Sequence, residues 1–134
     1  MRAPKIPCKI EAYAAVGPSE DPEKIREAIS NVIVDANYEF KEGSMKAVSK
    51  DLESLSRIQE TIRKRKANRV YRRQMRFHTS GDTTWFYLNK QAAFVDVIAV
   101  CEEAEESPMG PIKVILHSGD VEGIIDWLAP EFVE

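Results

Sequence analysis

The sequence predicts an α+β fold: a mostly antiparallel sheet with helices on one face and one long central helix. Segments with strand-like alternation are interspersed irregularly with segments of helical periodicity. The connections between them carry hairpin-like turn signals, which favour an antiparallel or mixed sheet. Between Ser44 and Ser80 there is no glycine and no proline, so this stretch permits a very long helix.

The N-terminal part of the chain is expected to form a strand, a helix and a second strand. Residues 8–15 alternate in part and predict a strand that ends at a glycine–proline pair. Asp21 is suited to cap a helix whose first residue is a proline. Apolar residues then recur at helical spacing, which predicts an amphipathic helix over 22–33. Residues 37–41 alternate again and predict a short strand.

The central segment, 46–77, is predicted to be mostly one helix, with Ser49 as an alternative N-cap. Its first half has an apolar face formed by Leu52, Leu55, Ile58 and Ile62, but the same face becomes basic in the second half. Burying those charges would be costly. The second half is therefore expected either to project beyond the core or to bend near residues 64–66. After a bend, a narrow apolar band of Ala67, Val70 and Phe77 would turn inward.

The remaining elements follow strong local signals. In chain order we expect a strand at 83–88, a helical turn at 91–94, a buried central strand at 97–101, an acidic connection at 102–106 and a strand at 112–116. Ser118 is suited to cap a last helix, which Pro130 stops.

Composition predicts a single soluble domain, residues 1–134, with 43% hydrophobic and 31% charged residues. No apolar run approaches membrane-spanning length, and the first seven residues hold no apolar stretch typical of a signal peptide. We therefore expect a cytoplasmic protein without a membrane partner. Cys8 and Cys101 are far apart in apolar runs, which favours free thiols over a disulfide.

Positive charge is concentrated in one segment. Residues 57–76 hold nine of the 19 Lys and Arg residues but only one of the 22 Asp and Glu residues. This asymmetry points to an anionic partner, RNA above all, although a solvated helix face compensated by nearby acids is the competing interpretation. The candidate RNA-binding residues are Arg65, Lys66, Arg69, Arg72, Arg73, Arg76 and Lys90.

Catalytic and metal chemistry is not evident. His78 and His117, the only histidines, have no partner at a recognised ligand spacing, and no glycine-rich phosphate loop is present. We therefore expect no catalytic residue, metal site or cofactor, and no enzyme activity. The polar trio Asn89, Lys90 and Gln91 could bind a phosphate, ribose or base edge, but we favour a role in fixing a tight turn.

Two aromatic residues of the predicted strand at 83–88 share one face. Trp85 and Tyr87 alternate with Phe86 and Leu88, so one pair faces the core. If Trp85 and Tyr87 face solvent, they could stack on bases. If helix 22–33 or a partner subunit covers them, they are ordinary packing residues, and this is the interpretation we favour.

Three motifs together resemble an archaeal family of unassigned function, UPF0201. They are the strings TTWFYLNKQAAF at 83–94, ESPMGPI at 106–112 and DWLAP at 126–130. Residues 20–24 fit the family as well, so the resemblance covers essentially the whole chain. It implies a fold similar to ribosomal protein L5 and a role in RNA binding. The resemblance carries no assigned catalytic residue.

The sequence thus leaves two function hypotheses. In the first, the protein binds RNA or a ribonucleoprotein, with the basic helix contacting phosphates. In the second, it is a protein–protein module or homodimer subunit without nucleic-acid binding. Residues 102–106 of one subunit would then neutralise residues 63–76 of another.

Overall fold

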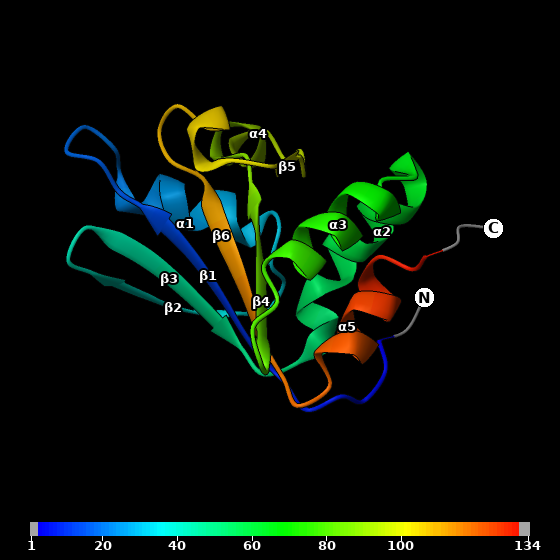
Figure 1. The fold of residues 1–134 in the computed structure, drawn as a ribbon. Coiled ribbons are helices and arrows are strands. Elements are labelled where there is room, and N and C mark those ends of the chain that lie inside the picture. Colours follow the sequence, from blue (N-terminus) through cyan, green and yellow to red (C-terminus); the bar gives the residue numbers. More distant parts are fainter. Residues whose placement is uncertain (1–2, 132–134) are drawn as a thin grey trace.

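The computed structural model describes residues 3–131 and is built around one six-stranded sheet. In spatial order the strands are β2 (Asn37–Lys41), β3 (Ser44–Ser49), β1 (Lys9–Ala15), β6 (Ile112–His117), β4 (Thr83–Leu88) and β5 (Val100–Cys101). All neighbouring strands are antiparallel (Figure 1). The predicted α+β class and antiparallel sheet are confirmed.

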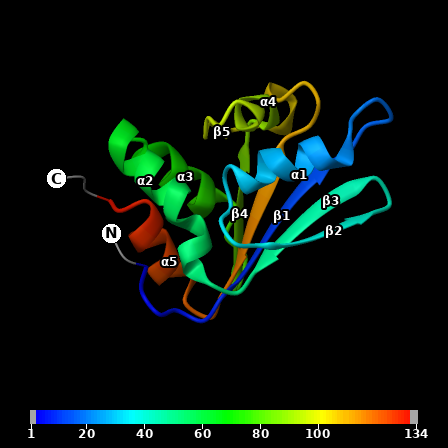
Figure 2. The same ribbon diagram turned by 180° about the vertical axis from the view of Figure 1, so that it is seen from behind.

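Helices cover one face of this sheet. They are α1 (Pro22–Ser30), α2 (Ser56–Arg65), α3 (Asn68–Phe77), α4 (Lys90–Phe94) and α5 (Val121–Leu128), with 3-10 turns at Leu52–Leu55 and Ala104–Glu106. Helix α1 packs on β1 and β3, α3 packs on β4, and α5 contacts α2 and α3. Figure 2 shows α1 in front of the strands from this side. The expectation of helices on one face is confirmed.

The two faces of the sheet differ because side chains alternate along each strand. Ala12, Val114 and Phe86 are lateral neighbours on the helix-covered face, and all three are fully buried. Their alternating neighbours lie on the other face, which we call the open face. Its charged and aromatic residues are Lys9, Glu11, Tyr13, Glu39, Lys41, Lys46, Trp85, Tyr87, Lys113 and His117.

The first helix begins as predicted and ends early. Asp21 accepts a hydrogen bond from the Glu23 N–H at 3.0 Å, which caps α1. The helix stops at Ser30 instead of residue 33, but Val32 and Ile33 remain buried. Apolar periodicity therefore marked the buried residues correctly and placed the end of the helix too late.

The single helix predicted over 46–77 is wrong. Glu42 and Gly43 have positive φ values of 52° and 74°, and they close a tight hairpin between β2 and β3. Strand pairing therefore takes the first part of the segment. Lys66 adopts the left-handed conformation, with φ 53° and ψ 42°, and ends α2 before α3 starts. The bend considered near residues 64–66 is present as a break between two helices.

The central strand predicted over 97–101 is wrong as well. Only Val100–Cys101 forms a strand, and this strand lies at the edge of the sheet beside β4. The Val97 N–H donates to the Ala92 carbonyl at 2.9 Å, and Asp96 has a positive φ of 60°. Val97, the first residue of the apolar run, therefore closes the turn that ends α4 and does not pair in the sheet.

The strands predicted at 83–88 and 112–116 are confirmed as β4 and β6, and the last helix needs one correction. Asp120, not Ser118, caps α5 by accepting from the Gly123 N–H at 3.0 Å. Ser118 instead donates its hydroxyl hydrogen to the Pro7 carbonyl at 2.8 Å.

Within residues 3–131, no helix combines the length and apolar character needed to cross a membrane. The cysteines are free thiols: Cys8 is half-buried and Cys101 is buried.

Candidate nucleic-acid interface

The basic segment forms the helix pair α2–α3. The pair docks through buried apolar residues, among them Ile58 and Ile62 of α2 and Met75 of α3. The connection between the helices lies at the end of the pair that points away from the strands (Figures 1 and 2). Because the core holds only one side of each helix, most basic side chains of the segment remain exposed.

Four of the predicted RNA-binding residues line one groove on α3. The groove has a volume of about 630 Å³, and its lining residues are Asn68, Arg69, Arg72, Arg73, Arg76 and Glu131. The spacing of these arginines by three or four residues places them on one side of the helix. The structure therefore brings together Arg69, Arg72, Arg73 and Arg76, as the helical spacing predicted.

Three of these arginines are paired with acids of the same chain. Arg72 and Arg76 each lie 2.9 Å from a carboxylate of α5, Asp126 and Glu122 respectively. Arg73 lies 2.5 Å from Glu102, in the acidic connection after β5. The competing interpretation, that nearby acids compensate the basic segment, thus describes these three arginines.

Arg72 differs from the other two in its burial. Its side chain is only 16% exposed, and it also donates to the Ala129 carbonyl at 3.1 Å. Asn68 makes a similar contact, donating to the Pro130 carbonyl at 2.7 Å. These two side chains join α3 to the end of α5.

The basic residues of the segment that form no ion pair within residues 3–131 lie where α2 meets α3. Arg63, Arg65, Lys66 and Arg69 are exposed, and none forms an ion pair within residues 3–131. We call these four residues the α2–α3 corner. The corner also contains the N-terminus of α3, which has no side-chain cap and adds partial positive charge.

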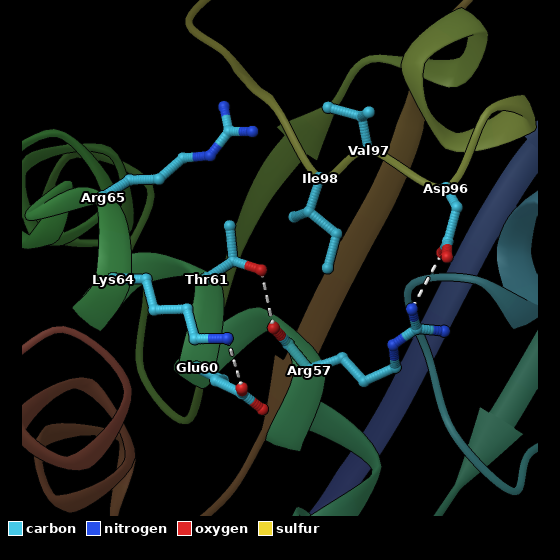
Figure 3. A pocket seen from close by; sticks show the side chains of 8 residues that line it. All are labelled: Arg57, Glu60, Thr61, Lys64, Arg65, Asp96, Val97 and Ile98. Atoms are coloured by element: carbon cyan, nitrogen blue, oxygen red, sulfur yellow. Dashed lines mark hydrogen bonds and ion pairs between the residues drawn. The ribbon is translucent and has the colours of Figure 1, made fainter.

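A second hollow lies on the other side of α2, with a volume of about 310 Å³. Figure 3 shows Arg65 directed toward it, across from Val97 and Ile98. Its remaining charges are paired: Arg57 contacts Asp96 at 2.8 Å, and Lys64 contacts Glu60 at 2.9 Å. Among the residues lining this hollow, Arg65 is therefore the cation without an ion pair within residues 3–131. Arg69 has the same position in the lining of the α3 groove.

Lys90 lies apart from the other candidate residues. Its side chain is completely buried, and its Nζ lies 3.1 Å from Glu20 and donates to the Ala15 carbonyl at 2.9 Å. Asn89 caps α4 by accepting from the Ala92 N–H. Gln91 accepts from the Ser107 hydroxyl. The trio thus has the turn-fixing arrangement favoured from the sequence, and Lys90 does not lie on the basic surface.

The aromatic strand residues face away from the helices. Trp85 and Tyr87 lie on the open face and are partly exposed, so helix α1 does not cover them. The His78 ring stacks on Trp85 with centroids 3.4 Å apart, and Lys113 Nζ lies 4.3 Å from the Trp85 centroid. Sequence reasoning missed this contact, because nothing local joins residue 78 to the open face.

Phe77 contradicts its expected place in an inward apolar band. It is the last residue of α3, and 81% of it is exposed. Ala67 and Val70 are partly buried against the core, whereas Tyr71 and Met75 fill the interior instead. The face of α3 that packs on the core carries Tyr71 and Met75, and at 100° per residue Phe77 lies well away from that face.

Ionisable groups on the open face are arranged around Glu11. Its carboxylate lies 3.0 Å from Lys46 Nζ and 2.6 Å from His117 Nε2, and it accepts from the Tyr13 hydroxyl at 2.9 Å. Burial alone would raise the pKa of Glu11, but hydrogen bonds from Lys46, Tyr13 and His117 outweigh it and lower the pKa to about 2. No group of three metal-ligating side chains occurs in the part of the chain that the structure describes.

Comparison with known proteins places this geometry in a family. A family model described as RNA binding matches residues 9–118. A UPF0201 protein of Methanothermobacter thermautotrophicus is 38% identical over 123 residues, covering 92% of each chain. A UPF0201 protein of Metallosphaera sedula is 34% identical, covering 91% of this chain and 87% of its own.

Solved structures agree with the sequence matches. The crystal structure of an uncharacterized UPF0201 protein superimposes with a TM-score of 0.78 at 30% identity, covering 92% of this chain and 94% of the other. The UPF0201 protein from Methanococcus jannaschii gives a TM-score of 0.79 at 26% identity, with the same coverage. The similarity to ribosomal protein L5 stays a prediction.

Proposed function

Since the chain belongs to the UPF0201 family, whose matching model is described as RNA binding, we propose that it binds RNA through the α2–α3 corner and the adjoining α3 groove. The observation that carries the proposal is the unpaired charge at the corner. Four cations stand together there without an acid partner in residues 3–131, in a chain whose net charge is −3. Such a local excess of positive charge is what phosphate groups recognise.

The paired arginines extend this surface. Arg73 and Arg76 are about half exposed, and each holds one surface carboxylate. Exposed ion pairs contribute little to stability, so a phosphate can replace the carboxylate at small cost. Arg72 stays bound to α5 and positions the helix. Contacts of this kind fix the register of RNA on the protein and do not read its sequence.

The homodimer alternative receives less support. It requires the acidic connection at 102–106 to neutralise basic residues of a second subunit. Glu102 already binds Arg73 of its own chain at 2.5 Å. The α2–α3 corner has no acid of its own to offer a second copy, so two corners would repel each other.

Filter binding of a single-stranded RNA tests the proposal. If roughly four phosphates are contacted, log K falls with log salt at a slope of about −3. The double variant Arg65→Glu/Arg69→Glu removes most of the affinity and flattens the slope. The matched control, Lys24→Glu/Lys50→Glu, makes the same charge change at exposed residues far from the corner and retains more of the affinity and the slope. Wild-type protein that retains no RNA at low salt, or equal losses in both variants, contradicts the proposal.

A further inference from the structure

A ladder of four aromatic rings leads from the end of α3 onto the open face of the sheet. The Phe77 and His78 centroids are 5.1 Å apart in an edge-to-face arrangement. His78 stacks on Trp85 at 3.4 Å, and Trp85 is 4.9 Å from Tyr87. We call these four residues the aromatic ladder. Phe77 lies four residues after Arg73 of the α3 groove in the same helix, so the two side chains are neighbours on the helix surface and the ladder adjoins the groove.

The outer end of the ladder is unusually exposed. Phe77 leaves 81% of its surface in water, whereas the helix it belongs to buries Tyr71 and Met75. The inner rings are held in place: His78 Nδ1 donates a hydrogen bond to the Trp85 carbonyl at 3.1 Å, and Lys113 lies over the Trp85 ring. The ladder is therefore a fixed platform whose first ring is free.

Resting on the proposed function, we infer that the RNA is single-stranded, that its phosphates follow α3, and that an unpaired base stacks on Phe77. Bases in a duplex are stacked on each other and cannot reach a protein ring, whereas an unpaired base can stack on an aromatic side chain. The basic residues 69–76 run along α3 toward Phe77, so one strand can contact both.

The charge of the open face favours this occupant over a second copy of the chain. The open face carries more lysines than acidic residues. The lysines are Lys9, Lys41, Lys46 and Lys113, and the acids are Glu11 and Glu39. Glu11 is neutralised by its own cationic neighbours. Two copies joined at the ladder would bring like charges together, whereas a polyanion matches them.

Fluorescence anisotropy with a labelled 12-nucleotide oligouridine and a 12-base-pair RNA duplex tests the inference. The wild type binds the single strand more tightly than the duplex. Phe77→Ala lowers single-strand affinity about tenfold, equivalent to about 1.4 kcal/mol, and leaves the salt slope unchanged, because no phosphate contact is lost. The control is Phe40→Ala, which removes a half-exposed phenylalanine from β2, at the opposite edge of the sheet, and leaves the affinity unchanged.

Tryptophan fluorescence provides an independent measurement. The chain has two tryptophans, and Trp127 lies buried in α5, so the variant Trp127→Phe leaves Trp85 of the ladder as the only tryptophan. Oligouridine shifts or quenches the Trp85 emission, and the duplex does not. This signal weakens in the Phe77→Ala background.

The outcomes separate the inference from the function on which it rests. If the wild type binds neither RNA at low salt, both fail. If it binds both RNAs equally and Phe77→Ala changes nothing, RNA binding stands and the single-strand inference is overturned. Sedimentation that shows a dimer dissolved by Phe77→Ala also overturns it and assigns the ladder to a second copy.

Discussion

The ammonium group of Lys90 lies 3.1 Å from a carboxylate oxygen of Glu20; the Lys90 side chain is completely buried and that of Glu20 is 9% exposed. The same Nζ donates to the Ala15 carbonyl at 2.9 Å, and Glu20 accepts from the Gly17 N–H at 2.8 Å. One buried ion pair therefore joins the start of α4, the end of β1 and the loop before α1. The pair holds these three segments together, and the buried Lys90, a candidate RNA-binding residue, does not reach the basic surface.

Removing one partner of this pair is expected to be costly. Lys90→Ala leaves the buried Glu20 carboxylate without its cation, which lowers the free energy of unfolding by about 3–5 kcal/mol. The matched control is Lys64→Ala, which breaks the exposed pair with Glu60 and changes stability little. Urea unfolding of both variants measures the difference. Equal, small losses would show that the buried pair does not hold these segments together.

Sequence reasoning succeeded where local chemistry decides the structure. Asp21 caps α1, the strand at 37–41 forms as its alternation indicates, and the strand at 83–88 forms as its β-branched and aromatic residues indicate. It failed at β3, where the hairpin turn at Glu42-Gly43 and pairing with β1 outweigh a segment free of helix breakers. Pairing with a distant strand has no local signal in the sequence. The absence of glycine and proline allows a helix over this segment but does not require one.

In the candidate site too, the sequence predicts the features that depend on local residues and not those that depend on distant contacts. The local concentration of charge was readable from the sequence, and α3 does present its arginines on one side. Which of them remain unpaired was not readable, because Glu102 and Glu122 come from distant segments. The burial of Lys90 depends on Glu20, 70 residues away. The exposure of Phe77 depends on which face of α3 packs on the core, and that face carries Tyr71 and Met75.

Lys66 itself is in a conformation that disfavours a side chain. Its φ of 53° places it in the left-handed region at the end of α2, where glycine is the preferred residue. Lys66→Gly is therefore expected to raise the free energy of unfolding by about 0.5–1 kcal/mol. The same substitution two residues earlier, Lys64→Gly, lies within α2 and lowers it by about 1 kcal/mol. Thermal unfolding distinguishes the two; a loss of stability in both variants would contradict the assigned helix break.

The lowered pKa of Glu11 predicts that the free energy of unfolding falls in acid. Its pKa is about 2 in the folded protein, against an ordinary value of 4.5, because the hydrogen bonds from Lys46, Tyr13 and His117 outweigh the effect of burial. Since the folded-state pKa is the lower one, the stabilisation is complete above about pH 4.5 and is lost as the pH falls toward 2. The difference corresponds to on the order of 3 kcal/mol.

The variant Glu11→Gln isolates this contribution. It lacks the carboxylate at every pH, so it is less stable than the wild type at pH 7, and the gap between the two narrows as the pH falls from about 4.5 to 2. Glu39→Gln is the matched control, because Glu39 lies on the same open face but forms no ion pair within residues 3–131. Its gap from the wild type is small, because no ion pair is lost. Urea unfolding at a series of pH values measures both gaps. A Glu11→Gln gap that does not change with pH would mean that these neighbours do not stabilise the Glu11 carboxylate in solution.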